Sequence, residues 1–163
     1  MNPNDPKQLR ILAVAPSSEG FGFAVFEGQT LGDWGVKSVN GDKNAQGLKK
    51  VEELIMHYQP EVLVLQDCDA NDSRRAPRIR TLSRKLIALA EKSGLRVALF
   101  SNQQVIRAYF TGGEGTKHER AEIIAQRFPE ELGSRVPAKR RPWTSEDGQM
   151  GVFDAVALAL MVC

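Results

Sequence analysis

Three oxygen-bearing side chains stand where an apolar run of the sequence ends. The run is residues 62–65, and Gln66, Asp67 and Asp69 follow it in the stretch VLVLQDCD. Valine and leucine over so short a length favour a strand buried on both faces, and functional groups in α/β sheets gather beyond such strand ends. Carboxylates there can hold a divalent metal such as Mg²⁺. The alternative is a solvated loop in which an Asp caps the element that follows.

A single carboxylate interrupts the apolar C-terminal segment. Asp154 is the only charged side chain between Met150 and the C-terminus. Burying an unpaired carboxylate costs several kcal/mol, so Asp154 requires a partner, a metal ion or a place at the edge of the core. The alternative is an acid that the helix dipole favours in an early turn. Glu146 and Asp147 lie just before this segment, and they are either further metal ligands or first-turn acids of the same helix.

A glycine-rich stretch, TGGEGTKH at residues 111–118, opens a helical pattern. Backbone N–H groups at the start of a helix can bind a phosphate, and Lys117 would add a positive charge. A plain turn is an equally good interpretation of the glycines. Lys117 is therefore a candidate site residue that needs other support.

Two clusters of basic residues are the strongest indication of a nucleic-acid partner. Each phosphate that a basic side chain neutralises releases counterions, and an aromatic ring can stack on a base. The alternative for either cluster is solvated charge on the flank of a helix. The candidate nucleic-acid-binding residues are Arg74, Arg75, Arg78, Lys85, Lys139, Arg140, Arg141 and Trp143.

The elements that must position these residues follow from hydrophobic periodicity. We predict strands at 9–15, 22–26, 34–39, 62–65 and 97–100, and helices at 44–58, 77–94, 103–110, 117–128 and 150–162. Both later strands should be buried, and so should the last helix, which is apolar nearly all round. Residues 129–150 look irregular. The order predicts an α/β fold with an antiparallel three-strand meander, further parallel strands added through helical crossovers, and helices on both faces.

Length and composition indicate one domain spanning residues 1–163, with 1–7 a flexible arm. The N-terminus has no apolar core of a secretory signal, and the apolar C-terminal segment is too short to span a bilayer. The two cysteines form no metal-binding or disulfide pattern. We therefore expect a cytoplasmic protein with no membrane contact. The net charge of +2 does not by itself demand a nucleic-acid partner.

In this order, the residues resemble the RuvC family of Holliday junction resolvases, within the RNase H-like superfamily. The first strand of that family ends in Asp-Pro-Gly-Ser, and a glycine opens the second strand. The corresponding places here are taken by Ala15, Pro16, Ser17, Ser18 and Gly22. The family's second acid is a glutamate at the end of the fourth strand, and Gln66 takes its place.

The C-terminal segment and the glycine-rich loop extend the resemblance. The last two acids of the family lie three residues apart on the final helix, the second of them in an Asp-Ala-x-Ala-x-Ala run. Asp154 matches the second in the run DAVALAL, and Gly151 stands at the first. The family's Thr-Gly-x-Gly loop with a following lysine is similar to the loop that begins at Thr111 and reaches Lys117.

What the resemblance implies is a two-metal phosphodiesterase site from which most carboxylates have been lost. Ala15, Gln66 and Gly151 replace three of the four family acids. We therefore expect no bound cofactor. If the chain is active, the expectation is Mg²⁺ or Mn²⁺ held by Asp154 with one or more of Asp67, Asp69, Glu146 and Asp147.

The sequence thus predicts a RuvC-like protein that binds branched or duplex DNA and has weak or no nuclease activity. The resemblance also implies a homodimer. Two alternatives stay open at this point: a metal-dependent, structure-specific DNA endonuclease that uses relocated carboxylates, and a non-enzymatic module that uses the same fold to bind a protein.

Overall fold

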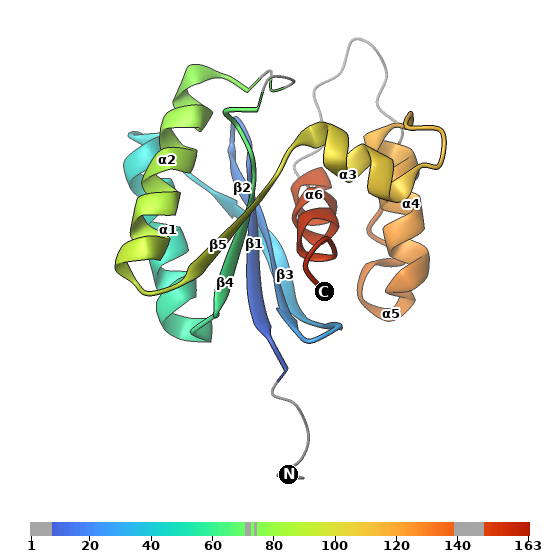
Figure 1. Cartoon of the computed structure of the whole chain (residues 1–163), viewed down its shortest axis with the longest axis horizontal. Coiled ribbons are helices and arrows are strands. Elements are labelled where there is room, and N and C mark those ends of the chain that lie inside the picture. Colours follow the sequence, from blue (N-terminus) through green and yellow to red (C-terminus); the bar gives the residue numbers. More distant parts are fainter. Residues whose placement is uncertain (1–7, 71–72, 74, 139–148) are drawn as a thin grey trace, which may run out of the picture.

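The computed structural model describes residues 8–70, 73, 75–138 and 149–163. Five strands form one mixed sheet in the order β3-β2-β1-β4-β5 (Figure 1). They are β1 (Arg10–Pro16), β2 (Gly20–Glu27), β3 (Thr30–Ser38), β4 (Val62–Gln66) and β5 (Arg96–Phe100). The first three pair antiparallel, whereas β4 runs parallel to both β1 and β5. This arrangement confirms the predicted α/β fold.

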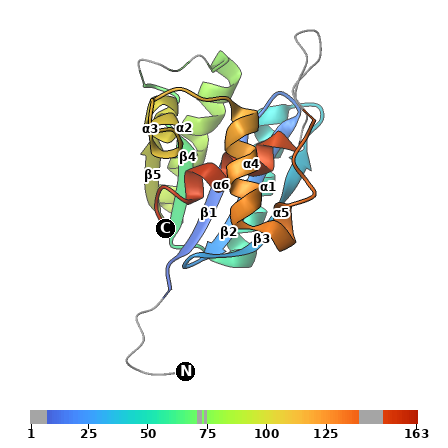
Figure 2. The same ribbon diagram turned by 90° about the vertical axis from the view of Figure 1, so that its right-hand side faces the viewer.

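Helices cover both faces of the sheet (Figures 1 and 2). One face carries α1 (Lys43–Tyr58) and α2 (Pro77–Lys92). The other carries α3 (Asn102–Tyr109), α4 (Lys117–Arg127), α5 (Pro129–Leu132) and α6 (Met150–Ala159). No helix in the described part of the chain is long and apolar enough to cross a bilayer.

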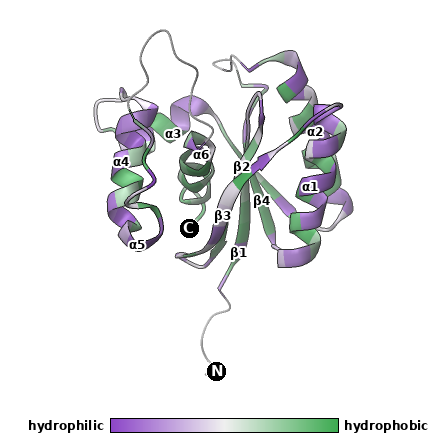
Figure 3. Cartoon of the chain, turned by 180° about the vertical axis from the view of Figure 1, so that it is seen from behind, coloured by the Kyte–Doolittle hydropathy of each residue, from purple (hydrophilic) through white to green (hydrophobic). Residues whose placement is uncertain are grey.

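The strand β4 is buried on both faces, as its continuous apolar sequence predicts. Leu63 and Leu65 belong to the core under α1 and α2, whereas Val62 and Val64 belong to the core under α6. A central parallel strand packs against helices on both sides, so every side chain along it must be apolar. Figure 3 shows the same division, with hydrophobic residues along β1 and β4 between the two helical layers.

The predicted burial of β5 is wrong. Arg96 is exposed, and Leu99 is 39% exposed. The reason is that β5 is an edge strand with one neighbour, β4. An apolar pentapeptide does not reveal whether a second strand will pair with it, because strand order is a property of the whole chain.

Two further elements differ from the predicted boundaries. The segment after residue 128, expected to be irregular, contains the short helix α5, in which Pro129 occupies the first turn and Leu132 is fully buried. The strand β3 begins four residues earlier than predicted, because Gly28 adopts a left-handed turn with φ 61° and brings Leu31 into the core.

The last helix packs closer to the sheet than side chains normally permit. Every residue of α6 except Asp154 is buried. A Cβ atom built on Gly22 of β2 would lie 2.1 Å from the carbonyl carbon of Gly151, and one built on Gly151 would lie 3.1 Å from the Gly22 nitrogen. The two glycines therefore let the backbones of β2 and α6 touch, and a Cβ at position 151 would press on the backbone of β2.

Candidate functional site

A pocket opens where the parallel strands β1 and β4 end, the edge at which α/β sheets usually carry their sites. Helices α2, α3, α4 and α6 close its sides. It is lined by Ala15, Pro16, Gln66, Cys68, Arg75, Ile79, Ser83, Asn102, Val105, Lys117, Arg120, Asp154 and Leu158. The structure thus brings five sequence-predicted site residues, namely Ala15, Gln66, Arg75, Lys117 and Asp154, to one place.

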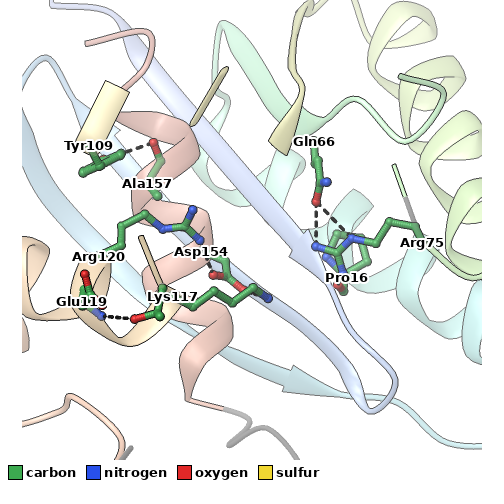
Figure 4. A network of polar contacts seen from close by, with 10 residues as sticks. Pro16, Gln66, Arg75, Tyr109, Lys117, Glu119, Arg120, Asp154 and Ala157 are labelled. Atoms are coloured by element: carbon green, nitrogen blue, oxygen red, sulfur yellow. Dashed lines mark hydrogen bonds and ion pairs between the residues drawn. The ribbon is translucent and has the colours of Figure 1, made fainter. Parts of the chain in front are cut away.

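Asp154 has two cationic partners in this pocket (Figure 4). The Nη2 group of Arg120 donates to Asp154 Oδ1 at 2.8 Å, and Lys117 Nζ lies 3.2 Å from Asp154 Oδ2. The side chains of Asp154 and Arg120 are only 13% and 7% exposed. The carboxylate therefore satisfies the requirement for a partner through α4, and both of its oxygens face positive charge.

Gln66, at the end of β4, is held by an arginine. Arg75 donates from Nε and Nη2 to Gln66 Oε1, at 3.0 and 2.7 Å, and from Nη1 to the carbonyl oxygen of Pro16 at 3.2 Å (Figure 4). The oxygen that stands at the end of β4 thus accepts two guanidinium hydrogen bonds. Arg75 also ties the end of β1 to the end of β4.

Several solved structures share this architecture. Thermus thermophilus RuvC superimposes with a TM-score of 0.65 at 19% sequence identity, covering 93% of this chain and 92% of that chain. RuvC of the same organism in complex with a Holliday junction substrate gives 0.64 at 17% identity, over 93% and 90% of the two chains. The yeast mitochondrial Holliday junction resolvase Ydc2 gives 0.63 at 14% identity, over 94% and 78%.

The chain has a RuvC-like fold. No family model matches the sequence, and no curated protein matches it significantly. The likeness is therefore carried by the backbone, over nearly the whole chain, and hardly by side-chain identity.

Arg120 is the residue of this RuvC-like pocket that sequence reasoning missed. It lies four residues before Ile124 and eight before Phe128, on the buried stripe of α4. Residues at that spacing share one helix face. A buried arginine requires an acidic partner just as Asp154 requires a cationic one, so a charge at an apolar position of the predicted helix was the available signal.

The acids that follow β4 do not reach the pocket. The Asp67 N–H donates to the carbonyl oxygen of Phe100 at 2.8 Å, and Asp67 Oδ1 accepts from the Asp69 N–H at 3.1 Å. Asp69 is paired with Arg84 at 2.8 Å, and this hydrogen bond lowers the pKa of the Asp69 carboxyl. Neither is among the residues lining the pocket. Both acids therefore lie in a loop, as the alternative interpretation predicted, but neither caps α2, whose N-cap is Ala76 and has no side-chain hydrogen bond.

The candidate basic residues before and within α2 divide into residues bonded inside the protein and residues exposed to solvent. Arg78 donates to the carbonyl oxygen of Ser17 and to Asn44 Oδ1, both at 3.1 Å, so it joins α1 and α2 to the turn after β1. Lys85 lies exposed on α2. The remaining candidates lie outside the described residues: Arg74, Lys139, Arg140, Arg141, Trp143, Glu146 and Asp147.

The glycine-rich loop ends in a capped helix. The Thr116 side chain accepts from the Glu119 N–H at 3.1 Å, and α4 begins at Lys117. Gly113 adopts φ 74°, a conformation that favours glycine. The loop therefore serves to place Lys117 at the mouth of the pocket, where it reaches Asp154.

The described residues do not fit a pair of divalent metal ions. Ala15 has no ligand atom, Gly151 faces β2, and the Gln66 oxygen faces Arg75. Among the described residues, no group of three or more His, Cys, Asp or Glu side chains could hold a metal. Among the residues that the structure describes, the pocket lining has three cationic side chains and one carboxylate. A Mg²⁺ ion prefers several hard oxygen ligands and would here meet an excess of positive charge.

We predict that Mg²⁺ and Mn²⁺ leave the thermal stability of the protein unchanged at constant ionic strength. A ligand that binds only the folded state raises its stability with concentration, and Asp154 is already neutralised by Arg120 and Lys117. Calorimetry with either metal, or with EDTA, measures the effect. A rise in melting temperature with Mg²⁺ that Asp154→Asn abolishes would show instead that other carboxylates complete a metal site.

Proposed function

We propose that this chain is a RuvC-like nucleic-acid-binding protein that recognises branched or duplex DNA and cleaves it weakly or not at all. Two kinds of support exist for the binding. The fold is that of Holliday junction resolvases over 93% of the chain. The pocket at the ends of β1 and β4 carries an excess of positive charge, which suits a phosphate backbone.

The observation that carries the loss of cleavage is the pairing of Asp154 with Arg120 and Lys117. Two-metal hydrolysis depends on carboxylates that bind the ions which activate water and stabilise the leaving oxygen. In this pocket the single carboxylate faces two protein cations, and Gln66 faces a third. Water activation by bound metal therefore lacks its ligands among the described residues.

A gel-shift experiment tests the proposal. Purified protein is mixed with a labelled four-way junction or with linear duplex of the same sequence, at two salt concentrations, in EDTA, Mg²⁺ or Mn²⁺. We expect a preference for the junction, weaker binding at higher salt, and no products in any metal. Metal-dependent cleavage that Asp154→Asn abolishes would favour the active endonuclease. No preference for DNA over heparin would favour a protein-binding module.

A lysine on α2 offers a matched pair of variants for the same experiment. We predict that Lys85→Gln lowers the slope of log affinity against log salt by about one, because a lysine that contacts a phosphate releases about one counterion. Lys92→Gln, at the C-terminal end of the same helix and also exposed, should leave the slope unchanged. Equal slopes for the two variants would remove Lys85 from the DNA-binding surface.

The proposed protein is a homodimer, as its resemblance to the RuvC family implies. Four-way junctions have approximate two-fold symmetry, and a two-fold dimer presents the same surface twice. Sedimentation equilibrium without DNA measures this. A monomer at all concentrations tested would contradict the dimer and leave the DNA-binding proposal to the gel-shift result.

A further inference from the structure

Cationic side chains hold the turn between β1 and β2 by three consecutive backbone carbonyl oxygens. The carbonyls of residues 16–18 accept, in chain order, from Arg75 at 3.2 Å, Arg78 at 3.1 Å and Lys43 at 2.6 Å. Arg75 lines the pocket, whereas Arg78 on α2 and Lys43 on α1 do not. Positive charge therefore continues from the pocket across the turn to α1.

A second lysine of α1 contacts the same corner of the sheet. Lys50 Nζ donates to the carbonyl oxygen of Ser38, at the end of β3, at 2.6 Å. Ser38 pairs with Gly20, the first residue after the turn. Lys43 and Lys50 are seven residues apart, and residues at that spacing share one face of a helix. This face of α1 therefore carries two lysines along the β1–β2 turn and the end of β3.

A lysine of β3 lies on the same side of the sheet. Lys37 Nζ is 5.8 Å from the centre of the Phe23 ring, and Phe23 belongs to the core under α1 and α2. Figure 3 shows that the outer sides of these two helices carry many hydrophilic residues. We call the following four residues, none of which lines the pocket, the α1 basic surface: Lys37, Lys43, Lys50 and Arg78.

The hydrogen bonds of this surface orient its charges without cancelling them. The acceptors of Lys43, Lys50 and Arg78 are backbone carbonyls and the side-chain amide oxygen of Asn44, all of which are neutral. Arg84, in contrast, contacts a carboxylate. A lysine ammonium has three N–H donors, so one bond to a carbonyl leaves two for a ligand. The surface thus presents fixed cations that keep their full charge.

Few acids stand beside these cations. Glu19 is exposed in the turn, and the Asp42 side chain caps α1 by accepting from a backbone N–H of its first turn at 3.1 Å. Glu52 and Glu53 lie further along α1, beyond Lys50. The four cations therefore outnumber the acids at the turn, and the N-terminal end of the α1 dipole adds to the positive potential.

We propose that the α1 basic surface binds the phosphate backbone of duplex DNA, outside the pocket. The inference rests on the proposed function, and it assigns Lys37, Lys43 and Lys50, which lie outside both basic clusters of the sequence, to DNA contact. Contacts to phosphates position a duplex and do not read its bases. The surface should therefore strengthen binding to branched and linear DNA alike.

Two features favour a nucleic acid over a protein as the partner. Along α1, about 10 Å separates Lys43 from Lys50, and an extended polyanion with a charge every 3.4 Å or so along each strand can reach both. Protein interfaces have an apolar or aromatic centre. The exposed large hydrophobic residues in the described part of the chain are Met56, Leu99 and Ile123, and none belongs to this surface.

The salt dependence of DNA binding in EDTA tests the inference. We expect Lys50→Gln to lower the slope of log affinity against log salt by about one, and Lys43→Gln with Lys50→Gln to lower it by about two. The ratio of junction to duplex affinity should stay unchanged. Lys49→Gln is the matched control, because Lys49 is exposed on the same helix but points about 100° away from Lys50. Equal slopes for Lys49→Gln and Lys50→Gln would overturn the inference.

Charge-conserving variants separate a contact with DNA from support of the turn. Lys43→Arg with Lys50→Arg keeps both charges, so we expect the slope of the unaltered protein. Urea unfolding checks that all variants are folded. A loss of slope in the arginine variant as large as in the glutamine variant would mean that the lysines act by holding the turn, and would contradict direct contact with DNA.

The same titrations distinguish this inference from the proposed function. If the unaltered protein binds DNA and the double glutamine variant has the same salt slope, the surface is overturned and the DNA-binding function stands. If the unaltered protein binds neither DNA, the function is contradicted, and the DNA partner of this surface is contradicted with it. Weaker retention of the double variant on heparin, with unchanged DNA binding, would assign the surface to another polyanion.

Discussion

Gly22→Ala is expected to destabilise the protein by roughly 3 kcal/mol, at the upper end of the usual cost of overpacking. The added methyl group would lie 2.1 Å from the carbonyl carbon and 2.2 Å from the oxygen of Gly151. Both obstacles are backbone atoms of a buried helix, so no flexible side chain can move aside. Relief requires that α6 shift away from β2, which exposes apolar surface on both. Urea unfolding followed by circular dichroism measures the change.

Gly112→Ala is the matched control for this experiment. No atom lies within 4 Å of a Cβ built on Gly112 in the glycine-rich loop, so we expect a change within about 0.5 kcal/mol. Equal stability of the two variants would mean that β2 and α6 do not touch in solution. Because Asp154 lies one helical turn after Gly151, a shift of α6 should also weaken junction binding by Gly22→Ala at temperatures where it remains folded.

The same contact bears on attempts to introduce acids at positions 15 and 151, where the resemblance to the RuvC family implies them. An aspartate at position 151 would need its Cβ 3.1 Å from the Gly22 nitrogen, where the backbone must yield. Position 15 differs, because Ala15 lines the pocket and its side chain can be extended into it. An aspartate is therefore expected to be harder to place at position 151 than at position 15.

The sheet could be predicted from the sequence because its strands have distinct local patterns. Val62 to Leu65 is apolar without alternation, and the structure buries it on both faces. The position of β5 at the edge could not be predicted, since it depends on strand order. The helix α5 was missed because four residues with one buried leucine give too little periodicity.

Part of the pocket could be predicted from the sequence, namely Ala15, Gln66, Lys117 and Asp154. Asp154 stands out in an apolar helix, but its partner Arg120 lies 34 residues earlier in the chain. Local patterns do not report contacts across that separation. The arginines before and within α2 were interpreted as a DNA-binding cluster, and the structure shows that Arg75 and Arg78 also bond to the backbone after β1. Contact with DNA by these residues stays a prediction.

The other large effect should come from the buried pair. Arg120→Met is expected to cost about 3 kcal/mol, the lower end for breaking a buried ion pair, because Lys117 remains beside Asp154. The methionine fills part of the volume but leaves the carboxylate, 13% exposed, with one partner instead of two. Urea unfolding measures the loss. Arg84→Met is the control, since both members of the Arg84–Asp69 pair are more than half exposed and should contribute little.

A double-mutant cycle shows whether the pair is kept for stability or for its charge. We expect Arg120→Met combined with Asp154→Leu to be about as stable as the unaltered protein, because apolar residues often replace a buried ion pair without loss. The same double variant should bind the four-way junction more weakly, since Lys117 would no longer be positioned by Asp154. If the double variant recovers stability but not junction binding, the charges of Arg120 and Asp154 are retained for binding and not for stability. If the double variant instead remains as unstable as Arg120→Met, the ion pair is needed for the stability of the fold. That result would contradict the role of Asp154 in positioning Lys117.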